Sequence, residues 1–104
     1  WGAVVTESLM IGTPAVCSDA CGSSVIVKAS GVGGVFSVNQ KNAFVNMLRK
    51  QYKQGKLDLK KRQKIVGWAR CLGANSGAKY LDLIITNPKQ AIKNIPWNIE
   101  SKIV

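Results

Sequence analysis

The sequence has no histidine, only five carboxylates and only three cysteines, and each shortage removes a class of function. Without His, neither Ser-His-Asp nor Cys-His catalysis is available, and His-containing zinc sites are excluded. Three thiolates cannot complete a tetrahedral zinc site alone, so we expect no metal and no cofactor. Acid chemistry is left with five candidates: Glu7, Asp19, Asp58, Asp82 and Glu100.

Long hydrophobic runs are also missing, and none approaches the ~20 residues of a membrane-spanning helix. The first residues, Trp1 to Val5, contain neither an initiator Met nor a basic segment ahead of an apolar one. The chain therefore does not begin like a signal peptide, and we expect it to be a piece of a longer protein. Cys17, Cys21 and Cys71 match no redox or metal motif, which favours reduced, packed thiols and a cytoplasmic location.

Positive charge is abundant, with a formal net charge of +10 from 15 Lys+Arg against 5 Asp+Glu. Residues 41–70 carry ten of the basic residues and a single acid, Asp58. The ordinary explanation of this basic segment is two amphipathic helices with Lys-rich solvent faces. The alternative is that the chain functions as a basic binding module for nucleic acid or an anionic membrane surface. Because no aromatic residues interleave with Arg as in base-stacking platforms, we expect no nucleic acid, and a peripheral membrane role stays open.

The length of 104 residues suits one domain or a piece of one, and its first part has an α/β pattern. A helix over 4–11 has apolar or small groups on most faces, which predicts that it is largely buried, and residues 12–14 end it. Residues 15–17 and the end of 31–36 have the pattern of short buried strands. Residues 25–27 fit a helix or a strand equally.

From residue 39 the apolar period becomes helical, and three helices are expected. The order of elements indicates the closing part of an α/β layered domain. The tail over 89–104 is too apolar to be free, so we expect it to pack on this domain or on a part outside the chain. The expected caps and stops are Gly55 after the first helix, Asp58 before and Gly73 after the second, and Asn75 or Ser76 before and Asn87-Pro88 after the third.

The first residues also contain the candidate binding chemistry. Gly2 and Ala3 lead into a helix, and the N–H groups and partial positive charge of a helix N-terminus attract phosphate. Glu7 follows about one turn later, where a carboxylate could accept hydrogen bonds from both hydroxyls of a ribose. The alternative is that Glu7 is only an acid favoured by the helix dipole.

The run Glu7-Ser8-Leu9-Met10-Ile11-Gly12-Thr13-Pro14-Ala15-Val16-Cys17-Ser18-Asp19 resembles the E-A-x-x-x-G-T-P-V-x-x-S-D segment of retaining group 1 glycosyltransferases, which have the GT-B fold. The similarity continues through residues 20–22, 31–36 and 68–70, and residues 71–83 are similar to the next segment in one branch of the family. It therefore covers most of the chain.

The resemblance implies an α/β fold, the distal part of a Rossmann-like GT-B C-terminal domain with short parallel strands followed by several helices. Residues 1–86 would form part of the nucleotide-sugar-binding domain, and 87–104 a tail that packs on it or on the missing half. The parent enzyme would move a sugar from a nucleotide diphosphate sugar to a hydroxyl acceptor, a glycan or a lipid-linked one. Its N-terminal domain lies outside this chain, so we expect the chain alone to be inactive.

The family motif has two acids separated by seven residues, and Glu7 matches the second. The resemblance assigns donor binding to Trp1, Gly2, Ala3, Val4 and Glu7, with no catalytic residue and no metal ligand. Backbone N–H groups from Gly2 to Val4 would face the diphosphate and sugar, and Glu7 would hold the ribose hydroxyls. Trp1 would lie beside the sugar, or would be an ordinary core aromatic or an exposed chain end.

The loop after the first strand departs from the family pattern, because it contains Asp19-Ala20-Cys21-Gly22 where Asp-x-Gly-Gly is commoner. We expect Asp19 to cap the loop at the strand end and not to act as a catalyst. Cys21 is expected only to fill space.

Overall fold

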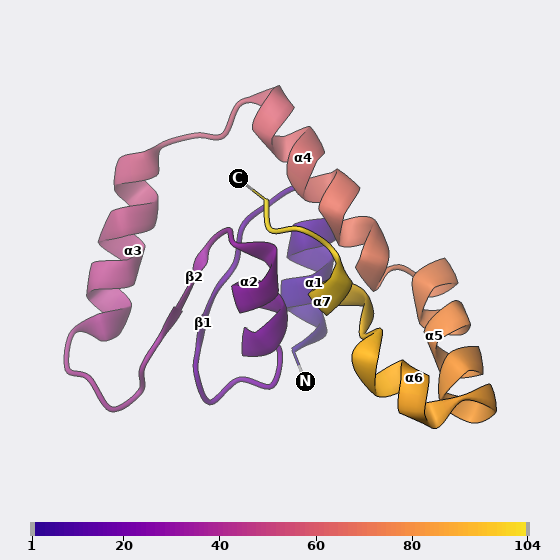
Figure 1. Ribbon diagram of the computed structural model, residues 1–104. Coiled ribbons are helices and arrows are strands. Elements are labelled where there is room, and N and C mark those ends of the chain that lie inside the picture. Colours follow the sequence, from indigo (N-terminus) through magenta and orange to yellow (C-terminus); the bar gives the residue numbers. More distant parts are fainter. Residues whose placement is uncertain (1, 104) are drawn as a thin grey trace.

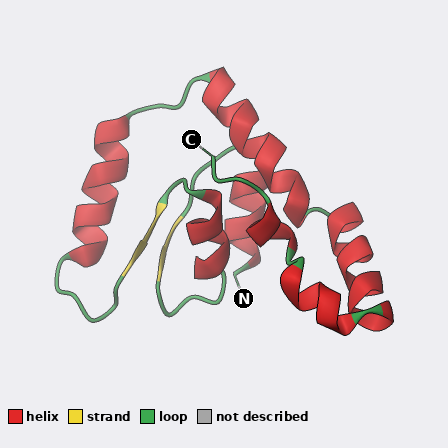
Figure 2. Cartoon of the chain, viewed as in Figure 1, coloured by secondary structure: helices red, strands yellow, loops and turns green. Residues whose placement is uncertain are grey.

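Two short parallel strands are surrounded by helices in the computed structural model, which describes residues 2–103 (Figures 1 and 2). The expected mixed α/β class is confirmed. The elements are α1 (Ala3–Met10), β1 (Val16–Ser18), α2 (Ser24–Ser30), β2 (Gly34–Phe36), α3 (Ala43–Gln54), α4 (Leu59–Ala69), the short 3-10 helix η1 (Arg70–Leu72), α5 (Ala74–Thr86), α6 (Pro88–Lys93) and α7 (Pro96–Ile99).

The strands β1 and β2 pair in parallel, with Cys17 opposite Val35 in the register. Helix α2 connects them, as a crossover must between parallel neighbours. Gly33 lets the second strand begin close to the first, because it has a φ of 73° and a Cβ there would overlap the backbone carbonyl of Ala15. Only glycine meets both conditions at this position.

The segment 25–27, which fitted a helix or a strand, forms the middle of α2. Ile26 and Val27 are both buried, and Gly31 ends the helix in the left-handed conformation with a φ of 75°. Three apolar residues in a row carry no period, so only their packing against neighbouring elements decides between the two structures.

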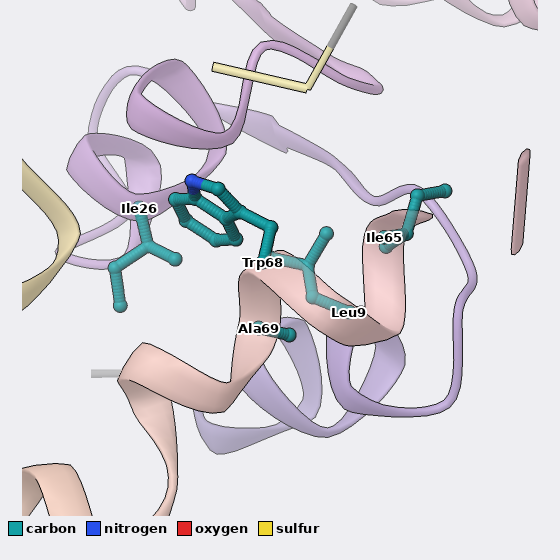
Figure 3. Close-up of a cluster of buried hydrophobic side chains, with 5 residues drawn as sticks. All are labelled: Leu9, Ile26, Ile65, Trp68 and Ala69. Atoms are coloured by element: carbon teal, nitrogen blue, oxygen red, sulfur yellow. The ribbon is translucent and has the colours of Figure 1, made fainter. Parts of the chain in front are cut away.

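The hydrophobic core lies where α1, α2 and α4 meet. Figure 3 shows its five buried side chains, with the Trp68 indole beside Ile26. Burial of each large side chain in such a core contributes roughly 1.5–3 kcal/mol relative to exposure. The cluster consists of Leu9, Ile26, Ile65, Trp68 and Ala69.

Helix α1 packs on one side only, so the prediction that it is largely buried is wrong. Leu9 is fully buried, whereas Val4 and Ile11 are 75% and 71% exposed. The packed side faces α4, where a Cβ at Gly12 would lie 3.2 Å from a methyl group of Val66. No layer formed by residues 2–103 covers the opposite side of the helix.

The ends of the later helices mostly follow the expected capping chemistry. The Asp58 carboxylate accepts a 2.7 Å hydrogen bond from the Lys61 N–H and caps α4, as predicted. The stops at Gly55 and at Asn87-Pro88 are also confirmed. The cap expected at Asn75 or Ser76 is wrong, since α5 begins at Ala74 after an extended Gly73. The stop expected at Gly73 ends the 3-10 helix η1, whereas α4 itself already ends at Ala69.

The C-terminal tail turns back onto α2. Helix α7 contacts α2, and the Ile103 N–H donates a 2.9 Å hydrogen bond to the Ser30 carbonyl. Trp97 and Ile103 pack against the core, while Ile92 is 75% exposed. No helix within residues 2–103 has the length and apolar character needed to cross a bilayer.

Candidate functional site

The start of α1 presents backbone amides to a ligand. Gly2 caps the helix without a side-chain hydrogen bond and adopts a left-handed conformation, with a φ of 88°. The Val5 N–H turns back to the Gly2 carbonyl at 3.0 Å. Within residues 2–103, no acceptor meets the N–H groups of Ala3 and Val4. Such amides, together with the helix dipole, form the usual anion site at a helix N-terminus.

Gly2 is held against the loop that follows β1. A Cβ at Gly2 would lie 2.9 Å from the Ser23 hydroxyl and 3.4 Å from the Cys21 sulfur. Any larger residue at this position would therefore both strain the backbone and displace the loop. The contact brings the helix start to the carboxyl end of a parallel strand, where open α/β sheets bind their ligands.

Glu7 shares one side of α1 with Ala3 and Val4, the first two residues of the helix. It lies four residues after Ala3 and three after Val4, and all three residues are exposed. Within residues 2–103, the Glu7 carboxylate makes no hydrogen bond or ion pair. Ala3, Val4 and Glu7 thus share one exposed side of α1, Gly2 lies at the helix start against the loop after β1, and the Glu7 carboxylate has no partner among residues 2–103. Trp1 lies outside the described residues.

The loop after β1 contains two cysteines with different environments. The Cys21 sulfur lies 2.9 Å from the Ser23 hydroxyl, and hydrogen bonding with Ser23 lowers the pKa of Cys21. Burial raises the pKa of Cys17, and the neighbouring Cys21 adds to this increase. Cys21 therefore does more than fill space, and the fully buried Ser23 is a neighbour of the site that the sequence did not single out. Its only sequence signal is its place in a loop of small polar residues after a strand.

Asp19 follows β1 and caps the segment after β2, which agrees with the predicted capping role at the strand end. Its carboxylate accepts a 3.2 Å hydrogen bond from the Val38 N–H, and its own N–H donates to the Phe36 carbonyl at 2.9 Å. Both bonds tie the end of β1 to the end of β2. No group of three or more metal-ligating side chains occurs in the part of the chain that the structure describes.

The larger hollows of the molecule lie elsewhere. One of about 590 Å³ lies on α3 beside Arg49 and Lys53, one of about 490 Å³ lies between α4 and the C-terminal tail, and one of about 300 Å³ lies between α3 and α4. The face with Glu7 is open surface, and it requires a second surface opposite it to enclose a ligand.

Comparison with known protein families shows to which family the chain belongs. The sequence model of the family described as "Glycosyl transferases group 1" matches residues 1–70. The chain belongs to this family of glycosyltransferases. The match runs from the start of the site to the residue after α4, so it includes the strand pair and every proposed donor-binding residue. No curated protein and no solved structure matches this glycosyltransferase chain.

Membership gives the chain a role in glycosyl transfer at the level of the family, whose members bind a nucleotide-sugar donor and an acceptor. The family match does not assign roles to single residues of this glycosyltransferase.

Proposed function

We propose that this chain is the distal part of the donor-binding domain of a retaining glycosyltransferase of GT-B type. The enzyme transfers a sugar from a nucleotide diphosphate sugar to a hydroxyl group of a glycan or lipid-linked acceptor. The observation that carries the proposal is the start of α1, where Gly2 lies against the loop after β1 and Ala3, Val4 and Glu7 share one exposed side of the helix.

The amides at the start of α1 bind the diphosphate in this proposal. Gly2 has no side chain to cover them, and glycine adopts the left-handed conformation of this N-cap position without strain. Hydrogen bonds aimed at the leaving diphosphate stabilise the charge that develops as the sugar departs. Trp1 would complete the sugar side of the pocket.

The Glu7 carboxylate binds the ribose. It is exposed and lies about one turn after the start of the helix, so a nucleotide whose phosphate contacts the helix start can reach it with its sugar hydroxyls. Two O–H groups on neighbouring carbons match the two oxygens of one carboxylate. Donor enclosure and acceptor binding need a second domain, so residues 1–104 alone are expected to transfer no sugar.

The test compares Glu7→Ala with Glu100→Ala in the full protein that contains this chain. Each hydrogen bond to a charged group contributes about 1.5–3 kcal/mol, so loss of both ribose contacts should weaken donor binding by roughly 100-fold or more. Glu100 is exposed near the tail, and its removal should leave donor KM and kcat unchanged. Unaltered donor affinity and turnover in Glu7→Ala would refute the role of this carboxylate.

A further inference from the structure

A second candidate site lies at the opposite end of the strand pair, away from Glu7. It is a pocket of about 300 Å³ between α3, α4 and the turns that precede β1 and β2, and we call it the amino-end pocket. Figure 1 shows the connection between α3 and α4 at one end of the strands and the start of α1 at the other. A ligand in this pocket would therefore not compete with a nucleotide at α1.

Three lysines from two helices line the amino-end pocket. Lys50 comes from α3, and Lys61 and Lys64 come from α4, while no carboxylate is among the lining residues. Within residues 2–103, none of these lysines forms an ion pair. The hollow of about 590 Å³ on α3 shares Lys50 and adds Arg49 and Lys53. Like charges held this close raise the local potential and attract anions.

The floor of the pocket is apolar. Leu57, Ile65 and Ile103 line the pocket together with the lysines, and the buried Ile65 belongs to the hydrophobic core. In the helix ends and connection around it, Tyr52 and Leu59 are 88% and 72% exposed. Cations around an apolar floor, with large apolar side chains exposed nearby, are the combination that binds the interface of an anionic bilayer.

We propose that the amino-end pocket binds the phosphate of an anionic phospholipid and thereby docks the α3–α4 end of the domain on a membrane surface. The lysines contact the headgroup, and the apolar floor receives the glyceride portion next to it. A nucleic acid backbone would use the same charges, but it has no group for the apolar floor and gains little from exposed aliphatic side chains. The lipid accounts for both features.

The experiment measures binding of the protein to vesicles of phosphatidylcholine with and without 30 mol% phosphatidylglycerol, by sedimentation at low and at physiological salt. The test variant replaces Lys50, Lys61 and Lys64 with Gln. The control variant makes the same charge change in α5 and α6, by replacing the exposed Lys79, Lys89 and Lys93 with Gln. The circular dichroism spectrum and thermal unfolding of both variants check that these surface changes leave the fold intact.

We expect binding only to vesicles that contain phosphatidylglycerol, with affinity that falls as salt is raised. Each lysine near such a surface contributes enough for the test variant to lose roughly 100-fold in partitioning. The control variant should lose less than about tenfold. An equal loss in both variants would show that only diffuse charge matters and would overturn the pocket proposal.

Two further arms distinguish the other ligands. Inorganic phosphate and a short RNA duplex are titrated against the same three proteins. Absence of vesicle binding, or RNA binding that depends on the pocket lysines and exceeds vesicle binding, would overturn the lipid proposal. Phosphate that binds in the millimolar range and competes with anionic vesicles would support a headgroup site, whereas phosphate binding without any vesicle binding would contradict it.

Discussion

The two sites that we propose at the ends of the β1–β2 pair would attract an anion by different means. At the carboxyl end, the open start of α1 offers backbone amides and a single carboxylate, Glu7, on a face where small residues leave the backbone accessible. At the amino end, Lys50, Lys61 and Lys64 surround an apolar floor. Amides fixed by a helix select a ligand by geometry, whereas flexible lysines respond mainly to its charge.

In this account, the start of α1 provides specificity for the donor, and the amino-end pocket provides attachment to the membrane. Short hydrogen bonds to fixed groups depend on the positions of the ligand atoms and only weakly on salt, whereas exposed charges are screened over a Debye length of about 10 Å at 0.1 M salt. We therefore expect donor binding to tolerate salt that abolishes membrane binding. Both ends depend on the same strand pair, so changes to that pair affect both.

The largest effect is expected for Gly33→Ala, which breaks the strand pair shared by the two ends. The added Cβ would overlap the Ala15 carbonyl, and the residue would be strained at its positive φ. We expect a loss of stability of about 4 kcal/mol or more, measured by urea unfolding. Gly55→Ala is the matched control, since Gly55 has a φ of 70° with nothing within 4 Å of a Cβ.

Gly55→Ala should cost roughly 1–3 kcal/mol, because a φ of 70° with a ψ of −168° is a conformation that is almost confined to glycine. Equal losses for the two variants would mean that the close approach of Gly33 to Ala15 does not constrain the strands.

A smaller effect separates the two sides of α1. Leu9→Ala removes a fully buried side chain and should lower stability by about 3 kcal/mol, within the roughly 2–5 kcal/mol of such core changes. Ile11→Ala, at a position 71% exposed, should change stability by less than about 0.5 kcal/mol. Comparable losses in thermal unfolding would show that the exposed side of the helix is packed after all.

The smallest effect distinguishes the thiol at the site from a distant one. Burial and the nearby Glu100 raise the pKa of Cys71 to about 11, whereas hydrogen bonding with Ser23 lowers the pKa of Cys21. At pH 8, Cys21 therefore has the larger thiolate fraction, and this difference outweighs the lower intrinsic nucleophilicity of a less basic thiolate. Mass spectrometry after brief iodoacetamide treatment should find Cys21 modified first.

Labelling of Cys71 should increase as the pH rises toward about 11, since its thiolate forms only there. Preferential modification of Cys71 at pH 8 would contradict the environments assigned to both residues.

Local chemistry predicted much of this fold from sequence. Helix caps and stops such as Asp58 and Gly55 act within a few residues, so they can be recognised without tertiary information. Pro88 has two local effects, since it prevents α5 from continuing and also suits the first position of the next helix, α6. Only the stop was predicted from the sequence.

Contacts between elements that are distant in the chain could not be predicted from the sequence. The apolar residues of α1 fit burial on several sides, yet only the side with Leu9 meets other elements of the described chain. Trp68 matched a family position but was not recognised as core, since its burial depends on α1 and α2 together. In the candidate site, the glycine and acid pattern was visible in sequence, whereas the contact between Gly2 and Ser23 joins segments about twenty residues apart and required the fold.

The most direct test of the donor site is a double-mutant cycle between Glu7 and the ribose. Donor affinity is measured by calorimetry for the full protein and for Glu7→Ala, each with a nucleotide diphosphate sugar and its 2′-deoxy analogue. Removal of the hydroxyl should weaken binding to the unmodified protein roughly tenfold and should have no effect in Glu7→Ala, because the contact is already lost. Equal discrimination against the deoxy analogue by both proteins would show that Glu7 does not hold the ribose.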